Sequence, residues 1–173
     1  QRQMCIRDRI GTICGWLYFV SEHASEALAH AIGERPVVKA MLAGLALAIC
    51  GTVLPYTMFA GETQADVLME TYLTIPAGVL IATGLVKAML TPALINLGWR
   101  GGHFFPVIFS GVSLGYGLAI LTGADPVFCV AVCTASTMGA VMRQPVMVVG
   151  LLLMCFPLKG IVCMLSLIHI SEP

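Results

Sequence analysis

The feature that most constrains this chain is a series of apolar runs that glycine and proline interrupt at irregular intervals. The runs over 37–58, 76–97 and 104–121 contain almost no charge, and only 10% of all residues are charged while 58% are hydrophobic. Soluble domains carry about 25% charged residues, and they rarely expose large apolar patches. The pattern therefore predicts an integral membrane protein whose main partner is the lipid bilayer.

The lengths of the apolar runs are uneven. Residues 37–58 and 76–97 are long enough to cross most of a bilayer as helices, whereas 65–73 and 127–141 are shorter. Broken helices at membrane depth are tolerated where the freed backbone is buried in protein or lines a polar cavity. Alternating ten-residue segments, which a membrane barrel of strands requires, are absent. We therefore expect an all-α polytopic membrane protein with broken and re-entrant helices.

Helix boundaries follow from the breaking residues. Turns are expected at the polar, glycine-rich and proline-rich stretches 33–36, 60–64, 98–102, 122–126 and 143–145. Pro36 and Pro106 suit the first turn of a helix, and Pro55 interrupts a helix late. Helices are accordingly expected over 10–32, 37–58, 65–73, 76–97, 104–121, 127–141 and 146–156, with a further segment beginning near 159.

We interpret the two ends of the chain as translated adapter sequence and not as part of the natural protein. The stretch LSLIHISEP at 165–173 resembles the translation of a transposase-end sequencing adapter, and MCIRDR at 4–9 resembles its opposite strand. We therefore assign 1–9 and 165–173 to adapter translation, and 10–164 to a partial membrane domain. Ordinary termini are the alternative.

Composition argues against several other functions. The nine basic and nine acidic residues balance, and no basic run is present, so no nucleic-acid partner is expected. The seven cysteines lie apart in apolar stretches without a CxxC pair, which is typical of small buried side chains and not of a zinc site. Cys129 and Cys133 share a helix face, where packing is the favoured interpretation.

A histidine pair is the other conceivable metal site. His23 and His30 are seven residues apart, beside Glu22 and Glu26, and would share one helix face. We favour a solvated polar face, and we expect neither a metal nor an organic cofactor.

Charged residues near the apolar runs are candidates for function. Glu62 and Glu70 flank the short helix, and the turn pattern places Glu62 at an aqueous edge. Lys87 lies inside an apolar run, where it either senses anions or extends its charge to the membrane surface; we favour the second interpretation. Arg143 is expected to cap or pair near a helix start.

The break at 98–106 carries the most chemistry. Gly101 and Gly102 leave the backbone without Cβ atoms, and a helix is expected to begin near Phe104. The first amides of a helix have no partner within it, and the helix dipole adds roughly half a positive charge there. Partial charges can bind an anion weakly enough to release it. From the residues alone, however, a break that serves only packing is the commoner explanation.

The stretch GWRGGHFFPVIFSGVSLGYGLA, at 98–119, resembles the segment GxxGGxFxPxxxxGxxLGxxxG of the CLC family of anion channels and anion/proton antiporters. Further resemblances follow in the family's order at 10–15 (GxxxG), 86–91 (VKAMLT) and 138–145 (MGAVMRQP). The resemblance implies an anion bound by the backbone amides of His103 and Phe104. The supporting frame would be Gly101, Gly102, Phe105 and Pro106.

Several expectations follow from this resemblance. The chain would be the second of two inverted repeats, and the gating and proton-carrying glutamates would lie in the first. Its function would be transport of inorganic anions, chloride foremost, by conduction or proton-coupled exchange, so it would not be an enzyme. The complete protein would be a homodimer in a bacterial inner membrane, with 146–156 at the interface. The arginine at position 100, before the glycine pair, makes this segment resemble that of a divergent bacterial branch of ion-transport proteins.

Alternatives remain open at this point. A fluoride-exporting relative has a similar anion segment, but it usually carries Asn where this chain has Tyr116. An unrelated broken-helix transporter coupled to cations would need intramembrane acidic or amide clusters, whereas the acids here gather in turns. A membrane assembly subunit without a pathway is the third class. Because the family uses the backbone at His103, we expect anion binding to survive removal of its side chain.

Overall fold

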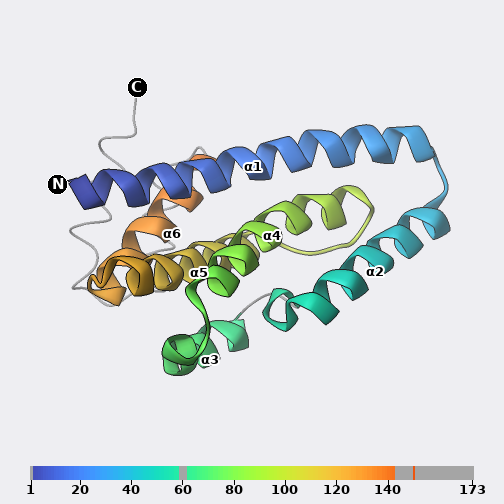
Figure 1. Ribbon diagram of the computed structural model, residues 1–173. Helices are drawn as coiled ribbons and strands as arrows, with labels where there is room; N and C mark the ends of the chain where they lie inside the picture. Colours follow the sequence, from blue (N-terminus) through green and yellow to red (C-terminus); the bar gives the residue numbers. More distant parts are fainter. Residues whose placement is uncertain (1, 59–61, 143–149, 151–173) are drawn as a thin grey trace.

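The computed structural model describes residues 2–58, 62–142 and 150, and it contains no strand within them. The elements are shown in Figure 1. In chain order they are α1 (Arg2–Ile32), α2 (Pro36–Val53), the 3-10 turn η1 (Pro55–Thr57), α3 (Glu62–Thr71), the 3-10 turn η2 (Tyr72–Thr74), α4 (Ala77–Asn96), α5 (Phe104–Thr122) and α6 (Pro126–Met142).

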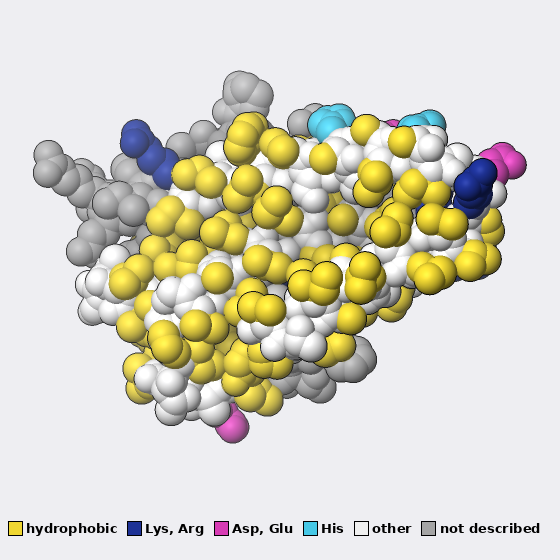
Figure 2. Space-filling view, turned by 45° about the vertical axis from the view of Figure 1, so that its right-hand side comes forward, with side chains coloured by type: hydrophobic (Ala, Val, Ile, Leu, Met, Phe, Trp, Pro, Cys, Tyr) yellow, Lys and Arg dark blue, Asp and Glu magenta, His cyan; other side chains and the backbone are white. Residues whose placement is uncertain are grey.

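Three of these helices, α2, α4 and α5, are long and apolar enough to cross a membrane, with 18, 20 and 19 residues. The fourth apolar helix, α6, is slightly shorter at 17 residues. Figure 2 shows a face whose centre is hydrophobic, with the charged and histidine side chains near its margins. The predicted all-α membrane fold with helices of uneven length is confirmed.

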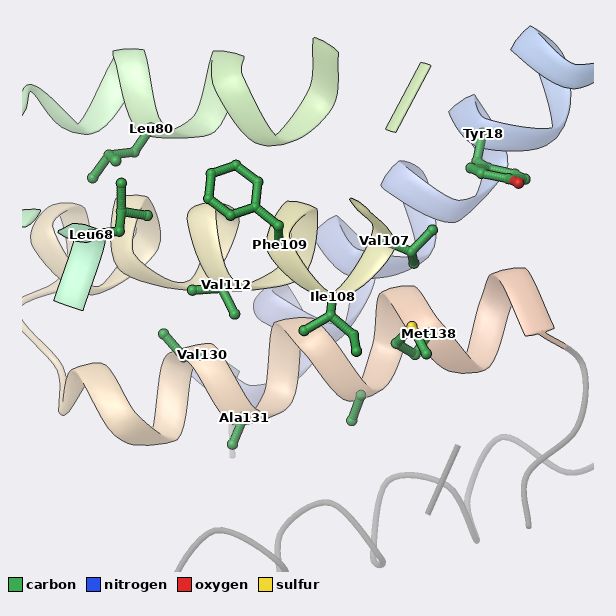
Figure 3. Close-up of a cluster of buried hydrophobic side chains, with 11 residues drawn as sticks. Tyr18, Leu68, Leu80, Val107, Ile108, Phe109, Val112, Val130, Ala131 and Met138 are labelled. Atoms are coloured by element: carbon green, nitrogen blue, oxygen red, sulfur yellow. The ribbon is translucent and has the colours of Figure 1, made fainter. Parts of the chain in front are cut away.

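The core is built around α5. Helices α1 and α5 each pack against both α4 and α6, so the four form one bundle, and α3 contacts α5 from outside it. Figure 3 shows Phe109 extending from α5 toward α4, while Ile108 and Val112 extend toward α6. Leu68 of α3 and Leu80 of α4 complete this buried cluster. The short α3 is therefore tied to the bundle by an apolar anchor.

Close contact between α5 and α6 depends on two glycines. A Cβ atom at Gly111 would lie 2.5 Å from the Cα of Thr134, and one at Gly115 would clash with the Cα of Val130. Small residues allow helix backbones to approach closely in lipid, where dispersion contacts and hydrogen bonds must hold helices together. The crossing of α5 and α6 is thus set by residues that lack a side chain.

The predicted breaks between helices are largely confirmed. Gly33, with φ of 67°, follows α1, and Pro36 begins α2. Pro55 begins η1, which is the late interruption expected within 37–58. Gly123, with φ of 64°, ends α5, and the Asp125 carboxylate accepts a hydrogen bond from the amide of Val127 at 2.8 Å.

One predicted boundary is partly wrong. The expected turn at 60–64 extended too far, because α3 already begins at Glu62. The stretch Glu62-Thr63-Gln64 is polar but contains no proline or glycine, and an acidic residue is favourable in a first helical turn. The polar segment is therefore the start of a helix.

Other expectations about the chain are untested. Helix α1 begins at Arg2, within the stretch assigned to adapter translation, but helical geometry says nothing about the origin of those residues. Arg143, the turn at 143–145, the dimer helix at 146–156 and the segment from 159 lie outside the described residues, apart from the helical Gly150.

The side chains that resembled metal ligands are buried cysteines of α6 and exposed residues of α1. Cys129 and Cys133 are fully buried, as expected for packing residues. His23 and Glu26 are exposed at the surface, with the imidazole Nδ1 4.0 Å from the carboxylate Oε2. Within the described ranges, no three histidine, cysteine or acidic residues gather in a group that could hold a metal ion.

Candidate functional site

The loop between α4 and α5 begins with a closed helix end. The amide of Gly98 donates to the carbonyl of Ile95, and that of Trp99 donates to Leu94, both at 3.0 Å. Gly98 has a φ of 98°, which glycine adopts without the steric cost of a Cβ atom. These bonds use carbonyls at the end of α4 and direct the chain into the exposed double glycine.

Helix α5 begins at Phe104, as expected, and Pro106 lies in its first turn. His103 is the N-cap residue and makes no side-chain capping hydrogen bond. The first intrahelical bond is donated by Val107 to the carbonyl of His103, at 3.2 Å. The amides of His103 and Phe104 donate to no other group in the described part of the chain. The amide of Phe105 likewise has no partner among the described residues, so three donors remain at the positive end of the α5 dipole.

A cavity of about 330 Å³ lies beside this helix start. Gly101, Gly102 and Pro106 line one part of it, and Thr57 and Met58 line another. A Cβ atom at either glycine would meet nothing within 4 Å, so the backbone there faces open space. The remaining wall is mostly apolar and comes from α2, the last turns of α4 and Trp99.

Not all of the predicted site residues reach this cavity. Gly101, Gly102 and Pro106 line it, but His103, Phe104 and Phe105 do not. His103 and Phe104 are partly buried and their rings stack, with centroids 5.0 Å apart. Phe105 is 46% exposed. The structure thus joins the glycine and proline frame to a hollow, while the imidazole contacts a neighbouring ring.

Lys87 differs from expectation. We expected its charge to extend to the membrane surface, but the residue is 3% exposed and lines the same cavity as the double glycine. Its Nζ donates to the carbonyl oxygens of Thr57 at 2.6 Å and Met58 at 3.4 Å, and it lies 5.6 Å from the centre of the Phe109 ring. The reason is position: Lys87 is near the middle of α4, about 13–15 Å from either end at 1.5 Å per residue.

Two basic side chains belong to the described lining of the cavity. Arg100, which is exposed, and the buried Lys87 both line it, and none of its described lining residues is acidic. Of the two acids expected to flank the short helix, both of which lie within α3, Glu70 is exposed, and the side chain of Glu62 is outside the described set. An anion entering this hollow would meet basic side chains and apolar walls, an arrangement suited to binding.

Comparison with known proteins agrees with the resemblance seen in the motifs. Residues 9–172 match the family described as voltage gated chloride channel, which covers nearly the whole chain. No curated protein and no solved structure matches the chain.

Proposed function

This chain belongs to the voltage gated chloride channel family, and on that premise we propose that its transported ion is chloride, bound transiently beside the start of α5. Family membership makes it part of a membrane anion transporter of the channel or antiporter type, and the alternative of an unrelated broken-helix transporter no longer holds. The liposome experiment described below distinguishes passive conduction from proton-coupled exchange.

The observation that carries the proposal is the open hollow of about 330 Å³ at the double glycine. Dehydrating chloride is costly, so a pathway must return part of that free energy through donors and positive potential. The amides of His103 and Phe104, which have no other described partner, would supply the donors. Gly101, Gly102, Phe105 and Pro106 would form the frame that keeps these amides accessible.

The surroundings of the protein form a second part of the proposal. Helices α2, α4 and α5 are long and apolar enough to cross a bilayer, and we propose the inner membrane of a bacterium as the protein's location. We further propose that the complete protein is a homodimer whose interface includes residues 146–156. Crosslinking of the protein in native membranes tests this arrangement, and a species that remains monomeric at all protein concentrations would contradict it.

Anion flux through liposomes tests the function. The whole encoded protein, obtained by extending the reading frame on both sides, is reconstituted and loaded with 300 mM potassium chloride, and chloride efflux is followed after a potassium ionophore is added. We expect efflux well above that of protein-free liposomes. Proton uptake measured in the same vesicles separates exchange, in which protons move against chloride, from conduction, in which they do not.

Fluoride loading is the matched comparison. Tyr116 stands where fluoride exporters of this family usually have Asn, and its ring stacks on Tyr72 with centroids 4.6 Å apart. We therefore expect chloride to move faster than fluoride. Fluoride efflux without chloride efflux would show that the substrate is fluoride and not chloride. The absence of both would overturn the proposed function.

A further inference from the structure

The last turn of α4 is fastened to α1 by the side chain of Asn96, shortly before the double glycine. Asn96 Nδ2 donates to the carbonyl of Glu22 at 3.1 Å and to the hydroxyl of Ser25 at 2.8 Å. The hydroxyl of Ser25 in turn donates to the same Glu22 carbonyl at 2.9 Å. A side-chain amide nitrogen carries two N–H donors, so Asn96 uses its full donor capacity on α1.

Pro92 separates this contact from the earlier part of α4. Proline has no backbone N–H, so the helical hydrogen bond to the carbonyl four residues earlier cannot form, and α4 is weakened at this point. Before the break, the hydroxyl of Ser21 in α1 donates to the carbonyl of Met89 at 2.6 Å. Beyond the break, Asn96 makes the hydrogen bonds to α1. The position of the last turn of α4 therefore depends on Asn96 more than an unbroken helix would require.

Helix α1 is a firm support for this contact because it packs closely on α6. A Cβ atom at Gly11 would lie 2.6 Å from the Cβ of Ser136, and one at Gly15 would clash with the Cβ of Ala140. Small residues at such positions let helix backbones approach closely in lipid. Asn96 thus ties the end of α4 to a helix that is itself fixed to the bundle.

The same turns of α4 form part of the cavity wall beside α5. Leu94, Ile95 and Trp99 line that cavity together with the double glycine, whereas Asn96 does not line it. Figure 1 shows the end of α4 and the loop that follows between α1 and α2, and both of these helices contact α4. The amides of Gly98 and Trp99 donate to carbonyls of this last turn, so its position carries directly into the loop.

We propose that Asn96 is a positioning residue of the anion site. Through its hydrogen bonds to α1, it sets where the double glycine and the adjoining cavity wall lie relative to the start of α5. This inference rests on the proposed anion transport and adds a residue that does not touch the ion. The attraction between an anion and partial charges depends on distance, and the supporting contacts of a site decide whether its donors are held at that distance.

Two substitutions, one on each side of Pro92, test this role by chloride efflux from liposomes that contain the whole encoded protein. The ionic strength is held constant, with gluconate replacing chloride. Asn96→Leu removes both donors and should raise the chloride concentration that gives half-maximal rate by about 3- to 10-fold, the range that hydrogen bonds between membrane helices are worth. Ser21→Ala is the matched control, because it removes a hydrogen bond between α1 and α4 before the break. It should lower the melting temperature but leave the half-maximal concentration within about 2-fold.

The outcomes separate the inference from its premise. If the unsubstituted protein moves chloride and Asn96→Leu lowers only the maximal rate or the melting temperature, then Asn96 serves packing alone and the inference is overturned. If Ser21→Ala raises the half-maximal concentration as much as Asn96→Leu, any loosening between α1 and α4 has the same effect, and the specific role of Asn96 is overturned. If the unsubstituted protein moves no anion, the proposed function itself fails and the inference fails with it.

A milder variant covers the case in which Asn96→Leu does not fold. Ser25→Ala removes the hydroxyl that accepts from Asn96, but it leaves the Glu22 carbonyl as an acceptor. We expect the half-maximal chloride concentration to rise by about 2- to 3-fold, because one of the two hydrogen bonds from Asn96 remains. Unchanged chloride affinity in Ser25→Ala would overturn the inference.

Discussion

At the scale of single residues, the double glycine affects how closely an ion can approach the backbone and is not needed for the stability of the fold. Neither Gly101 nor Gly102 has a positive φ, and a Cβ atom at either would enter open space. Glycine is thus not required there by the conformation of the loop or by packing. What an added methyl group would change is the distance at which an ion can approach the backbone beside α5.

This leads to the first prediction. Gly101→Ala and Gly102→Ala should each raise the half-maximal chloride concentration for efflux by about 3- to 10-fold, because the methyl group holds the ion farther from the amides and the helix dipole. The melting temperature in detergent should stay the same. Gly78→Ala is the matched control. Gly78 lies at the start of α4 and outside the cavity, and a Cβ atom there also meets nothing within 4 Å. Unchanged chloride affinity in both loop variants would argue against the backbone site.

The second prediction concerns His103, whose ring stacks on Phe104 and does not line the cavity. His103→Ala keeps the backbone amide, so chloride affinity should remain within about 2-fold, the range of substitutions away from critical contacts. Efflux from liposomes measures this. Complete loss of anion flux, with an unchanged circular dichroism spectrum and melting temperature, would show that the imidazole itself binds the ion.

Sequence and structure agree at some of these residues and differ at others, for physical reasons. Gly101, Gly102 and Pro106 could be singled out because glycine and proline report directly on backbone conformation. The burial of Lys87 could not, because its carbonyl partners at Thr57 and Met58 lie about 30 positions earlier and are brought close only by the folding back of η1. The one signal in the sequence was its central place in an apolar run.

At the scale of elements, the crossing of α5 and α6 is a close helix contact that depends on glycine. We predict that Gly111→Ala destabilises the protein by about 1–3 kcal/mol, because the new methyl group would lie 2.5 Å from the Thr134 Cα and the backbones must separate. This exceeds the gain in helix propensity from glycine to alanine, about 1 kcal/mol at most. Titrating the solubilised protein with a denaturing detergent measures the difference in the free energy of unfolding between the two proteins.

The control for this prediction has the opposite expected sign. Gly44 lies in α2 with open space around its Cα, so Gly44→Ala should stabilise the protein by about 0.5–1 kcal/mol through helix propensity alone. If both alanine variants are equally stabilised, the close contact of α5 and α6 is not present in the folded protein.

The start of α6 supplies a further prediction. The Asp125 carboxylate accepts hydrogen bonds from the amides of Val127 at 2.8 Å and Phe128 at 3.4 Å. Asp125→Ala should lower the free energy of unfolding by about 1 kcal/mol, whereas Asp125→Asn should stay within a few tenths, because Asn caps helices about as well. Hydrogen exchange at the amides of Val127 and Phe128 checks the local origin, and unchanged protection in Asp125→Ala would contradict it.

Element boundaries were predicted well from sequence wherever a breaker is present. Gly33 with Pro36, Pro55 and Gly123 each mark an observed end or start, because these residues restrict the backbone whatever surrounds them. The start of α3 was missed, since polar residues without a breaker fit a turn and a first helical turn equally. The packing order of α1, α4, α5 and α6 was beyond reach, because every face of an apolar helix is apolar and periodicity no longer distinguishes the buried side.

At the scale of the whole molecule, α2 shows how the bundle relates to the membrane. Ala43 is its one buried residue, while Met41 and Leu45 are 70% and 58% exposed and Val53 is 71% exposed. Water would make such a helix face costly, whereas lipid or another apolar segment of the transporter would not. Helix α2 also carries Leu47 to the cavity wall, so its insertion holds one side of the proposed anion site in place.

The last prediction follows from that placement. Leu45 is at the centre of α2, so replacing it with arginine should make membrane insertion of the segment Pro36–Val53 less favourable by about 3–4 kcal/mol. Placed in a host membrane protein with glycosylation sites on both sides, the unsubstituted segment should span and Leu45→Arg should largely fail to do so. Leu45→Phe, which stays apolar, should insert normally. Failure of the unsubstituted segment to span would mean that α2 lies at the membrane surface, and one wall of the cavity would then have to come from elsewhere.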